Sequence, residues 1–270
     1  MTNSMFDLSG RVALVSGAAS GMGKAMSLAL AAAGADIVLA DIDAEGMDET
    51  ATEIEQLNRR ALPADCDVSD PDQIRSMFAQ VDDEFGRIDI LGNVAGQAFR
   101  GAPEELPIEH LEATLQSIVV GRFCCCQEAG RRMLAAGSGS IMNIGSLASI
   151  TALGRGHLPY SIAMGGVVQM TRELSTEWSG RGVRVNAILP AQTLNESLRD
   201  RMAETPGLEE TYLGGIPSGR FGKPDDIAGL AVFLASDASS WITGALIPVD
   251  GGNLAMNAGG SYPGGPRVSG

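Results

Sequence analysis

The sequence predicts an α/β fold in which a single domain holds a doubly wound sheet of parallel strands, flanked by helices on both faces. Strand-like and helix-like segments alternate from residue 11 to residue 249. Such alternation is typical of parallel strands joined by helical crossovers. A chain of 270 residues is long enough to bury the core of one large domain of this class.

About seven apolar runs are expected to form the strands, over residues 11–15, 36–40, 61–68, 88–94, 140–144, 183–189 and 245–249. Helices are expected over residues 24–33, from residue 71, and over 109–134 and 160–178. Pro71 suits the first turn of a helix, where its missing N–H would have no partner, and Asp70 before it is a good N-cap. No internal repeat or linker interrupts this order, so we expect one domain over residues 1–252. A tail rich in Gly, Ser and Pro follows over 253–270, either loose or resting on a neighbouring subunit.

Residues 16–23 read Ser-Gly-Ala-Ala-Ser-Gly-Met-Gly and join the first strand to the first helix. Glycines here let the backbone turn sharply, approach a diphosphate closely and pack the helix against the strand. The free amides at the helix N-terminus and the positive end of its dipole then face the anion. An ordinary glycine turn is the alternative interpretation. We expect the dinucleotide contacts to come from Gly17, Ser20, Gly21, Met22 and Gly23.

The second apolar run ends in Asp41, which is followed by Ile42. A carboxylate at this strand end can accept hydrogen bonds from both ribose hydroxyls of an adenosine, and it repels a 2′-phosphate. No basic residue follows Asp41 until Arg59. The sequence therefore favours NAD over NADP, with Asp41 and Ile42 at the adenosine ribose, although a strand end that is merely solvated would look the same.

Composition excludes several classes of partner. The net charge of −14 argues against binding to nucleic acid or to anionic membrane surfaces. No signal-peptide pattern and no apolar run long enough to cross a bilayer is visible, so a cytoplasmic location is expected. The four cysteines, Cys66 and the run 124–126, lack the spacing of a metal site. We expect them to be reduced thiols in the core and expect no metal.

Further blocks follow the glycine turn in a fixed order: Asn93 to Gly96, Ser140 to Ser146, Tyr160 to Met164, Arg184 to Pro190, Gly219 to Pro224 and Val249 to Gly252. With these blocks the sequence resembles the short-chain dehydrogenase/reductase family over nearly all of residues 7–252. The resemblance implies a Rossmann-type fold with seven parallel strands and a homotetramer, or else a homodimer. In such tetramers the helices at 109–134 and 160–178 pair across a two-fold axis, and the final strand region forms a second interface.

The resemblance also assigns further cofactor contacts by position. Asp67 and Val68 would contact the adenine, and Asn93, Ala95 and Gly96 would line the cofactor. The nicotinamide end would be bracketed by Tyr160, Pro190, Ala191 and the backbone around Thr193.

The catalytic groups implied by the resemblance are Ser146, which would stabilise the substrate carbonyl, and Tyr160, which would act as acid and base. Four residues after the tyrosine the family has a lysine, and on the preceding long helix it has an asparagine. This chain has Met164 and Ile118 at those positions. Because residues i and i+4 share a helix face, the Met164 thioether lies where an ammonium would hold the nicotinamide ribose and favour the tyrosinate.

Loss of the lysine has a predictable effect on the chemistry. Near pH 7 only about one free tyrosine in a thousand is ionised, so alcohol oxidation, which needs the tyrosinate, is expected to suffer most. Carbonyl reduction needs only the neutral phenol as proton donor. Three hypotheses follow: a NAD(H)-dependent oxidoreductase of reduced activity, a non-catalytic binding or scaffold protein, and a non-redox lyase that uses the Ser/Tyr pair.

Residues 97–102, 150–159 and 192–216 are expected to surround the substrate, a small-molecule alcohol or ketone. Most of their large side chains are apolar or aromatic, which predicts a largely apolar substrate. His157 is expected to lie in this wall and not on a metal. The residues concerned are Phe99, Leu153, His157, Leu158, Leu194, Leu198 and Tyr212, with Arg100 and Arg155 as charged exceptions.

Overall fold

A single parallel sheet forms the centre of the computed structural model, which describes residues 4–154 and 156–256. Within these residues seven strands are ordered β3-β2-β1-β4-β5-β6-β7, and all neighbours pair in parallel. The strand order reverses between β1 and β4, and ligands of open α/β sheets bind beyond the carboxyl ends of the strands at such a point. The strands are β1 Val12–Ser16, β2 Asp36–Asp41, β3 Ala61–Asp65, β4 Ile90–Asn93, β5 Gly139–Ile144, β6 Val183–Pro190 and β7 Leu246–Val249. The predicted fold class is confirmed.

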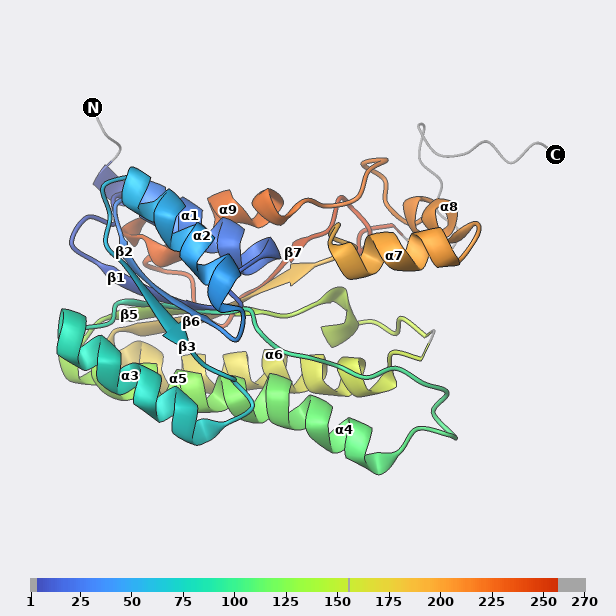
Figure 1. The fold of residues 1–270 in the computed structure, drawn as a ribbon, viewed down its shortest axis with the longest axis horizontal. Coiled ribbons are helices and arrows are strands. Elements are labelled where there is room, and N and C mark those ends of the chain that lie inside the picture. The colour runs from blue at the N-terminus through green and yellow to red at the C-terminus, as the bar shows by residue number, and fades with distance from the viewer. Residues whose placement is uncertain (1–3, 155, 257–270) are drawn as a thin grey trace.

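Helices cover both faces of the sheet (Figure 1). One face carries α1 (Gly21–Ala32), α2 (Ala44–Gln56) and α9 (Ala228–Ala235), and the other carries α3 (Pro71–Phe85), α4 (Ile108–Leu115), α5 (Gly121–Ala136) and α6 (Leu158–Trp178). Two short helices, α7 (Glu196–Glu204) and α8 (Leu208–Leu213), lie beyond the end of β7 (Figure 1). None of the described helices is long and apolar enough to span a membrane. Short 3-10 turns are Ser4–Phe6, Leu147–Ser149, Ser179–Arg181, Pro224–Ile227 and Asp237–Ser239.

Two hydrophobic cores lie on the two faces of the sheet. Along β1, Ala13 and Val15 belong to the core beneath α1 and α9, while Val12 and Leu14 belong to the core beneath α3 and α5. A strand buried on both sides reads as a continuous apolar run. This explains why the strands could be located from the sequence. As predicted, α3 begins at Pro71, and the Asp70 carboxylate accepts hydrogen bonds from the first-turn amides.

The long helix expected over residues 109–134 is interrupted. It consists of α4, a π-helical turn at Gln116–Val120 and α5. After the wide turn, α5 starts at Gly121, where a Cβ would lie only 1.9 Å from the carbonyl oxygen of Val68. Only glycine permits this close passage. The turn carries Ile118 at the sheet edge where the strands end.

The predicted tail can be followed only to residue 256, and the rest of 253–270 lies outside the described residues.

Candidate active site

The glycine turn has the backbone geometry expected of an anion-binding element. Gly17 and Gly21 adopt φ values of +71° and +54°, which only glycine accepts without strain. A Cβ on Gly23 would lie 1.9 Å from the Gly17 carbonyl oxygen, so the close packing of α1 on the turn also requires glycine. A Cβ on Gly21 would meet no atom within 4 Å. Ser20 is the N-cap residue of α1, whose first residues are Gly21 and Met22. Its side chain makes no capping hydrogen bond, so the N-terminus of α1 remains open to a ligand.

A cavity of about 420 Å³ lies next to this turn, beyond the carboxyl ends of β2 and β3. Seven of the sixteen cofactor residues predicted from sequence line it together. They are Gly17, Asp41, Ile42, Asp67, Val68, Ala95 and Gly96, joined by Cys66, Ser69, Gln97, Phe99, Ala113, Gln116 and Ser117.

Asp41 connects the end of β2 to the glycine turn. Its Oδ2 accepts a hydrogen bond from the N–H of Ala19 at 3.0 Å, and its Oδ1 accepts from the N–H of Ile42 at 2.8 Å. The carboxylate is thus fixed, yet its remaining lone pairs can accept from a ligand. Arg59, the next basic residue, donates to the Gly34 carbonyl oxygen at the other end of β2. No lysine or arginine lines the described part of this cavity.

Asn93 is placed differently from expectation. Its side chain is fully buried, and Nδ2 donates to Oδ1 of Asn143 at 2.9 Å. Asn143 in turn donates to Oγ1 of Thr171 on α6. The Asn93 side chain therefore ties β4 to β5 and, through Asn143, to α6, and it does not line the cavities. It lies there because β4 is buried on both faces up to its last residue.

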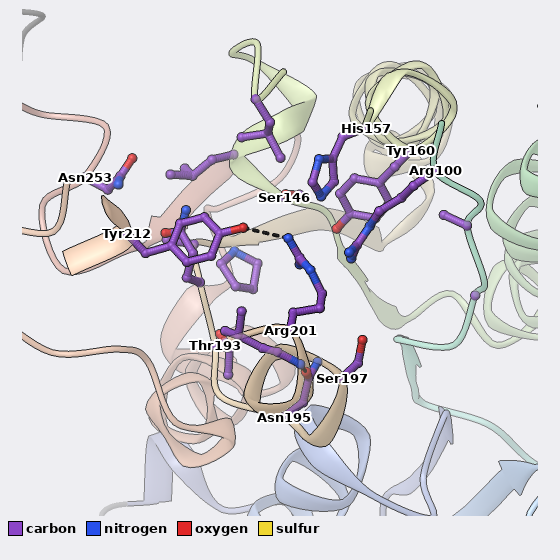
Figure 2. A pocket seen from close by; sticks show the side chains of 18 residues that line it. Arg100, Ser146, His157, Tyr160, Thr193, Asn195, Ser197, Arg201, Tyr212 and Asn253 are labelled. Carbon is purple, nitrogen blue, oxygen red and sulfur yellow. Dashed lines mark hydrogen bonds between the residues drawn. The ribbon is translucent and has the colours of Figure 1, made fainter. Parts of the chain in front are cut away.

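A second cavity of about 370 Å³ holds the predicted catalytic pair (Figure 2). Ser146 and Tyr160 line it together with Pro190, Ala191 and Thr193, the three residues expected around a nicotinamide. Gly96 borders both cavities. The cofactor and catalytic residues, predicted from distant parts of the chain, therefore meet along one edge of the sheet.

A local hydrogen bond holds Ser146, and a ring contact lies beside Tyr160, the two residues predicted to be catalytic. Ser146 is the N-cap of the Leu147–Ser149 turn, and its Oγ accepts from the N–H of Ala148 at 3.1 Å. Its hydroxyl hydrogen can therefore point toward a substrate oxygen. Tyr160 lies in the first turn of α6, with the His157 ring edge-on at 6.5 Å between centroids.

The two residues that depart from the family pattern, Ile118 and Met164, lie together in the structure. Ile118 and Met164 are 1% and 3% exposed and belong to the same apolar cluster, against which Tyr160 packs. Ile118 also lies against Gly96, where a Cβ would be 2.8 Å from Ile118 Cγ1. Neither position offers a polar group to the catalytic cavity.

One buried cation near the site could not be found from the sequence. Arg122 is 3% exposed, and its guanidinium donates to the carbonyl oxygens of Val94, Ala95 and Ile144. Burial lowers its pKa to about 10, while the nearby Tyr160 acts in the opposite direction. A single arginine within a helix carries no spacing signal, so no sequence pattern could have marked it.

Comparison with known proteins identifies the family. Residues 17–253 match a family model described as enoyl-(acyl carrier protein) reductase. The chain is 43% identical over 247 residues to D-threitol dehydrogenase of Mycolicibacterium smegmatis, with 92% of this chain and 94% of that protein covered. The chain belongs to the short-chain dehydrogenase/reductase family. Members of this family are oxidoreductases that bind a nicotinamide cofactor, and the homologues of this chain act on small-molecule alcohols or ketones.

Two further relatives differ in their cofactor: one is named as NAD-dependent, and the other was solved in complex with NADP. The NAD-dependent glycerol dehydrogenase of Listeria innocua is 39% identical over 248 residues, covering 92% of this chain and 95% of that protein. A solved structure of gluconate 5-dehydrogenase from Burkholderia cenocepacia, in complex with NADP and tartrate, has a TM-score of 0.88. It is 30% identical, and the match covers 94% of this chain and 99% of that one.

Proposed function

We propose that the chain is a NAD(H)-dependent oxidoreductase that interconverts a hydroxyl and a carbonyl, with Tyr160 as acid and base and Ser146 hydrogen-bonded to the carbonyl oxygen. One observation carries the proposal: Ser146 and Tyr160 line the same cavity as Pro190, Ala191 and Thr193. In oxidation the hydroxyl proton passes to Tyr160 and a hydride leaves the carbon, and reduction reverses both transfers. The bound nicotinamide supplies the hydride acceptor or donor.

The residues present fit this cofactor along its length. The open N-terminus of α1 suits the diphosphate. At the nicotinamide end, the Oε1 of Gln192 is buried and has no hydrogen-bond partner in the described part of the chain. Gln192 lines the catalytic cavity beside Thr193. Because an unpaired buried carbonyl is costly, a carboxamide N–H of the nicotinamide would satisfy it.

The preference for NAD is supported by charge at the adenosine end. A 2′-phosphate would lie among Asp41 and Asp67, and the described cavity wall offers no basic side chain to balance it. Placing like charges a few ångströms apart disfavours binding. NADH is therefore expected to bind more tightly than NADPH.

The substrate supported by the cavity wall is polar, in contrast to the largely apolar one expected from sequence. Arg100 and Arg201 both reach into the cavity (Figure 2). Arg201 donates to the Tyr212 hydroxyl at 2.8 Å, and neither arginine pairs with a carboxylate of the described residues. Burial and the like charge of Arg201 lower the pKa of Arg100. Two cations facing one cavity favour an anionic group on a hydroxylated substrate, such as a sugar acid.

Of the apolar wall expected from sequence, Leu153 and Leu198 do line the cavity. Leu158 is 44% exposed, and Phe99 lines the adenosine cavity instead. Arg155, the other charged exception, lies outside the described residues.

Calorimetric titration of NADH and NADPH followed by turnover assays tests the proposal. Sugar acids are compared with their uncharged polyols of equal length. Tyr160→Phe should lower kcat by about 100-fold or more, since general acid–base groups contribute that much, while NADH still binds. Arg201→Gln should raise KM for the acid by about 10-fold and leave KM for the polyol unchanged.

Other outcomes decide between the alternatives. Binding of NADH without turnover of any substrate would support the non-catalytic scaffold, which the apolar pair Ile118 and Met164 favours. If neither dinucleotide binds, the oxidoreductase proposal is wrong.

A further inference from the structure

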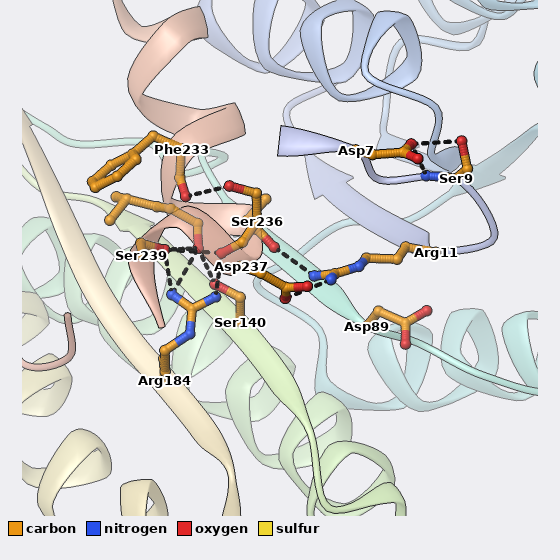
Figure 3. Close-up of polar contacts among 12 residues, drawn as sticks. Asp7, Ser9, Arg11, Asp89, Ser140, Arg184, Phe233, Ser236, Asp237 and Ser239 are labelled. Carbon is orange, nitrogen blue, oxygen red and sulfur yellow. Dashed lines mark hydrogen bonds and ion pairs between the residues drawn. The ribbon is translucent and has the colours of Figure 1, made fainter. Parts of the chain in front are cut away.

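Arg122 is buried and makes no ion pair with a carboxylate of the described residues. At the opposite edge of the sheet, by contrast, Arg11 pairs with Asp237 (Figure 3). The Arg122 guanidinium is instead held by backbone: Nε donates to Ala95 O at 3.2 Å, and Nη2 donates to Val94 O and Ala95 O at 3.0 and 3.1 Å. Nη1 donates to the carbonyl oxygen of Ile144. Three carbonyl oxygens thus take up most of its N–H groups.

The position of these carbonyls places the charge under the catalytic cavity. Val94 and Ala95 directly follow β4, and Ile144 ends β5 two residues before Ser146. A Cβ on Gly96, which lines the cavity with Tyr160, would be 3.6 Å from Arg122 Nη2. The guanidinium therefore lies at the carboxyl edge of the sheet, one backbone layer from the cavity.

Hydrogen bonding alone gives a weak reason for a charged group here. Three carbonyl oxygens can be satisfied by a neutral amide or by water, whereas a buried cation loses several kcal/mol of hydration unless an anion compensates. One group of this cavity becomes an anion during the proposed reaction, the Tyr160 phenol. Tyr160 packs against the cluster of Ile118, which lies one helical turn before Arg122 and, like Arg122, borders Gly96. Elsewhere around Tyr160, Ile118 and Met164 present only apolar atoms.

We propose that Arg122 is a positioning residue that stabilises the Tyr160 tyrosinate through its positive charge, from the sheet edge, where Met164 leaves α6 without a cation beside the tyrosine. The inference rests on the proposed function, because the tyrosinate matters as the base of alcohol oxidation. Arg122 does not touch substrate; it acts through Tyr160 across the Gly96 backbone. With Met164 in place of the family's lysine, the site has no ammonium, but the Arg122 guanidinium still supplies a positive charge.

Other titratable groups also face Tyr160 or Arg122. Arg100 also reaches toward Tyr160 from the loop after β4, but it is far less buried than Arg122, so water screens its charge more strongly. His157 faces the Tyr160 ring from the start of α6. Cys125 and Cys126 lie beside Arg122 on α5, and burial raises the pKa of both thiols well above the neutral range. These thiols stay neutral and do not compensate the arginine.

The test compares two variants. Arg122→Gln keeps amide donors but removes the charge, and Arg122→Lys keeps the charge but loses the planar set of guanidinium N–H donors. The matched control is Arg131→Gln, which removes an exposed arginine from the same helix. The first readout needs no turnover: ultraviolet tyrosinate absorbance against pH, with the spectrum of each Tyr160→Phe partner subtracted. The Tyr160 absorbance should develop about one pH unit higher in Arg122→Gln, since a neighbouring charge has effects of this size, and be unmoved in Arg122→Lys and Arg131→Gln.

The second readout is the pH profile of kcat for alcohol oxidation. Its acid limb should move upward by the same amount in Arg122→Gln, with about 10-fold lower kcat at pH 7 and KM unchanged. If Arg122→Gln folds and neither the Tyr160 absorbance curve nor the acid limb of the kcat profile moves, Arg122 has only a structural role and the inference is wrong. If Arg122→Gln does not fold, the Arg100→Gln variant decides, because it removes the other cation that faces Tyr160. Tyr160 absorbance that still develops below about pH 10 in this variant supports the inference, and absorbance that develops at or above that pH contradicts it. Because the absorbance readout is independent of turnover, it decides the role of Arg122 even if the proposed oxidoreductase activity is not found.

Discussion

Ile118 and Met164 lie in one buried apolar cluster, the first on the π-helical turn before α5 and the second on α6. Their burial makes the two departures from the family pattern a coupled pair. A polar group introduced at one position would face an apolar group at the other.

We therefore expect Met164→Lys to destabilise the fold and not simply to restore a catalytic site. An ammonium in this cluster should cost about 2–4 kcal/mol of unfolding free energy at pH 7. Burial would lower the pKa of the new lysine. The loss of unfolding free energy should therefore shrink as the pH rises toward the pKa of a free lysine. Urea unfolding at several pH values measures both effects. Gln169→Lys, on the exposed side of α6, is the control and should change stability by less than about 0.5 kcal/mol.

The double variant Ile118→Asn with Met164→Lys should recover part of this loss, since the amide oxygen can accept from the ammonium. Residues in contact commonly show coupling of about 1 kcal/mol or more. Purely additive losses would show that the two positions do not interact.

Asp41 should set the choice between dinucleotides. Asp41→Asn keeps an oxygen for the Ala19 N–H but removes the negative charge at the ribose. The ratio of NADPH to NADH dissociation constants should fall by about 10-fold or more, through weaker ribose contacts and lost repulsion. Calorimetry with both dinucleotides measures it, and Asp48→Asn on the exposed surface of α2 is the matched charge control. An unchanged ratio would remove the basis for preferring NAD.

The sequence allowed the strands and the glycine turn to be located because their causes are local. The apolar run of β2 and the glycines at positions 17, 21 and 23 are recognisable without knowing any distant contact. The π-helical turn depends on Gly121 passing the Val68 carbonyl, a contact between segments far apart in the chain. The sequence could not reveal it.

The site was predicted less completely for the same reason. Ser146 and Tyr160 were assigned through the resemblance to the family. The apolar substrate wall was inferred from the number of apolar side chains in three segments, without knowing which of them face the cavity. Leu158 is half exposed, whereas Arg201, on the exposed-looking polar helix α7, reaches inward. Arg122 could not be assigned because its partners are backbone carbonyls, which leave no trace in residue identity.

The four cysteines should behave as inert core thiols. Burial raises the pKa of Cys66 to about 11, helped by the carboxylate of Asp67, and that of Cys126 to about 12. At pH 8 fewer than about one Cys66 in a hundred would then be thiolate. A thiol reagent should label none of the cysteines rapidly in the folded protein and all four in urea. Rapid labelling of one native cysteine would contradict their placement.

These thiols also predict how stability depends on pH. Folded-state pKa values raised above the unfolded value favour the folded state fully below about pH 8.5, and this contribution is lost as pH rises through the folded values. The free energy of unfolding should therefore decline from about pH 9 toward pH 11. The decline should be shallower in Cys66→Ala, measured against its own value at pH 7.

Exposed apolar side chains predict the assembly. Phe123 on α5 is 45% exposed, Ile162 on α6 is 44% exposed, and Trp241 before β7 is 97% exposed. They lie on the helices and the final strand region that the resemblance to the family assigns to interfaces, and apolar exposure of this kind is typical of interfaces. Light scattering after gel filtration should show a tetramer. Phe123→Glu and Trp241→Glu should each give dimers, through the interface that remains, and the double variant should give monomers. If one variant gives dimers and the other remains a tetramer, only the apolar surface altered in the first variant is needed for the assembly. A monomeric wild-type protein at micromolar concentration would contradict the prediction.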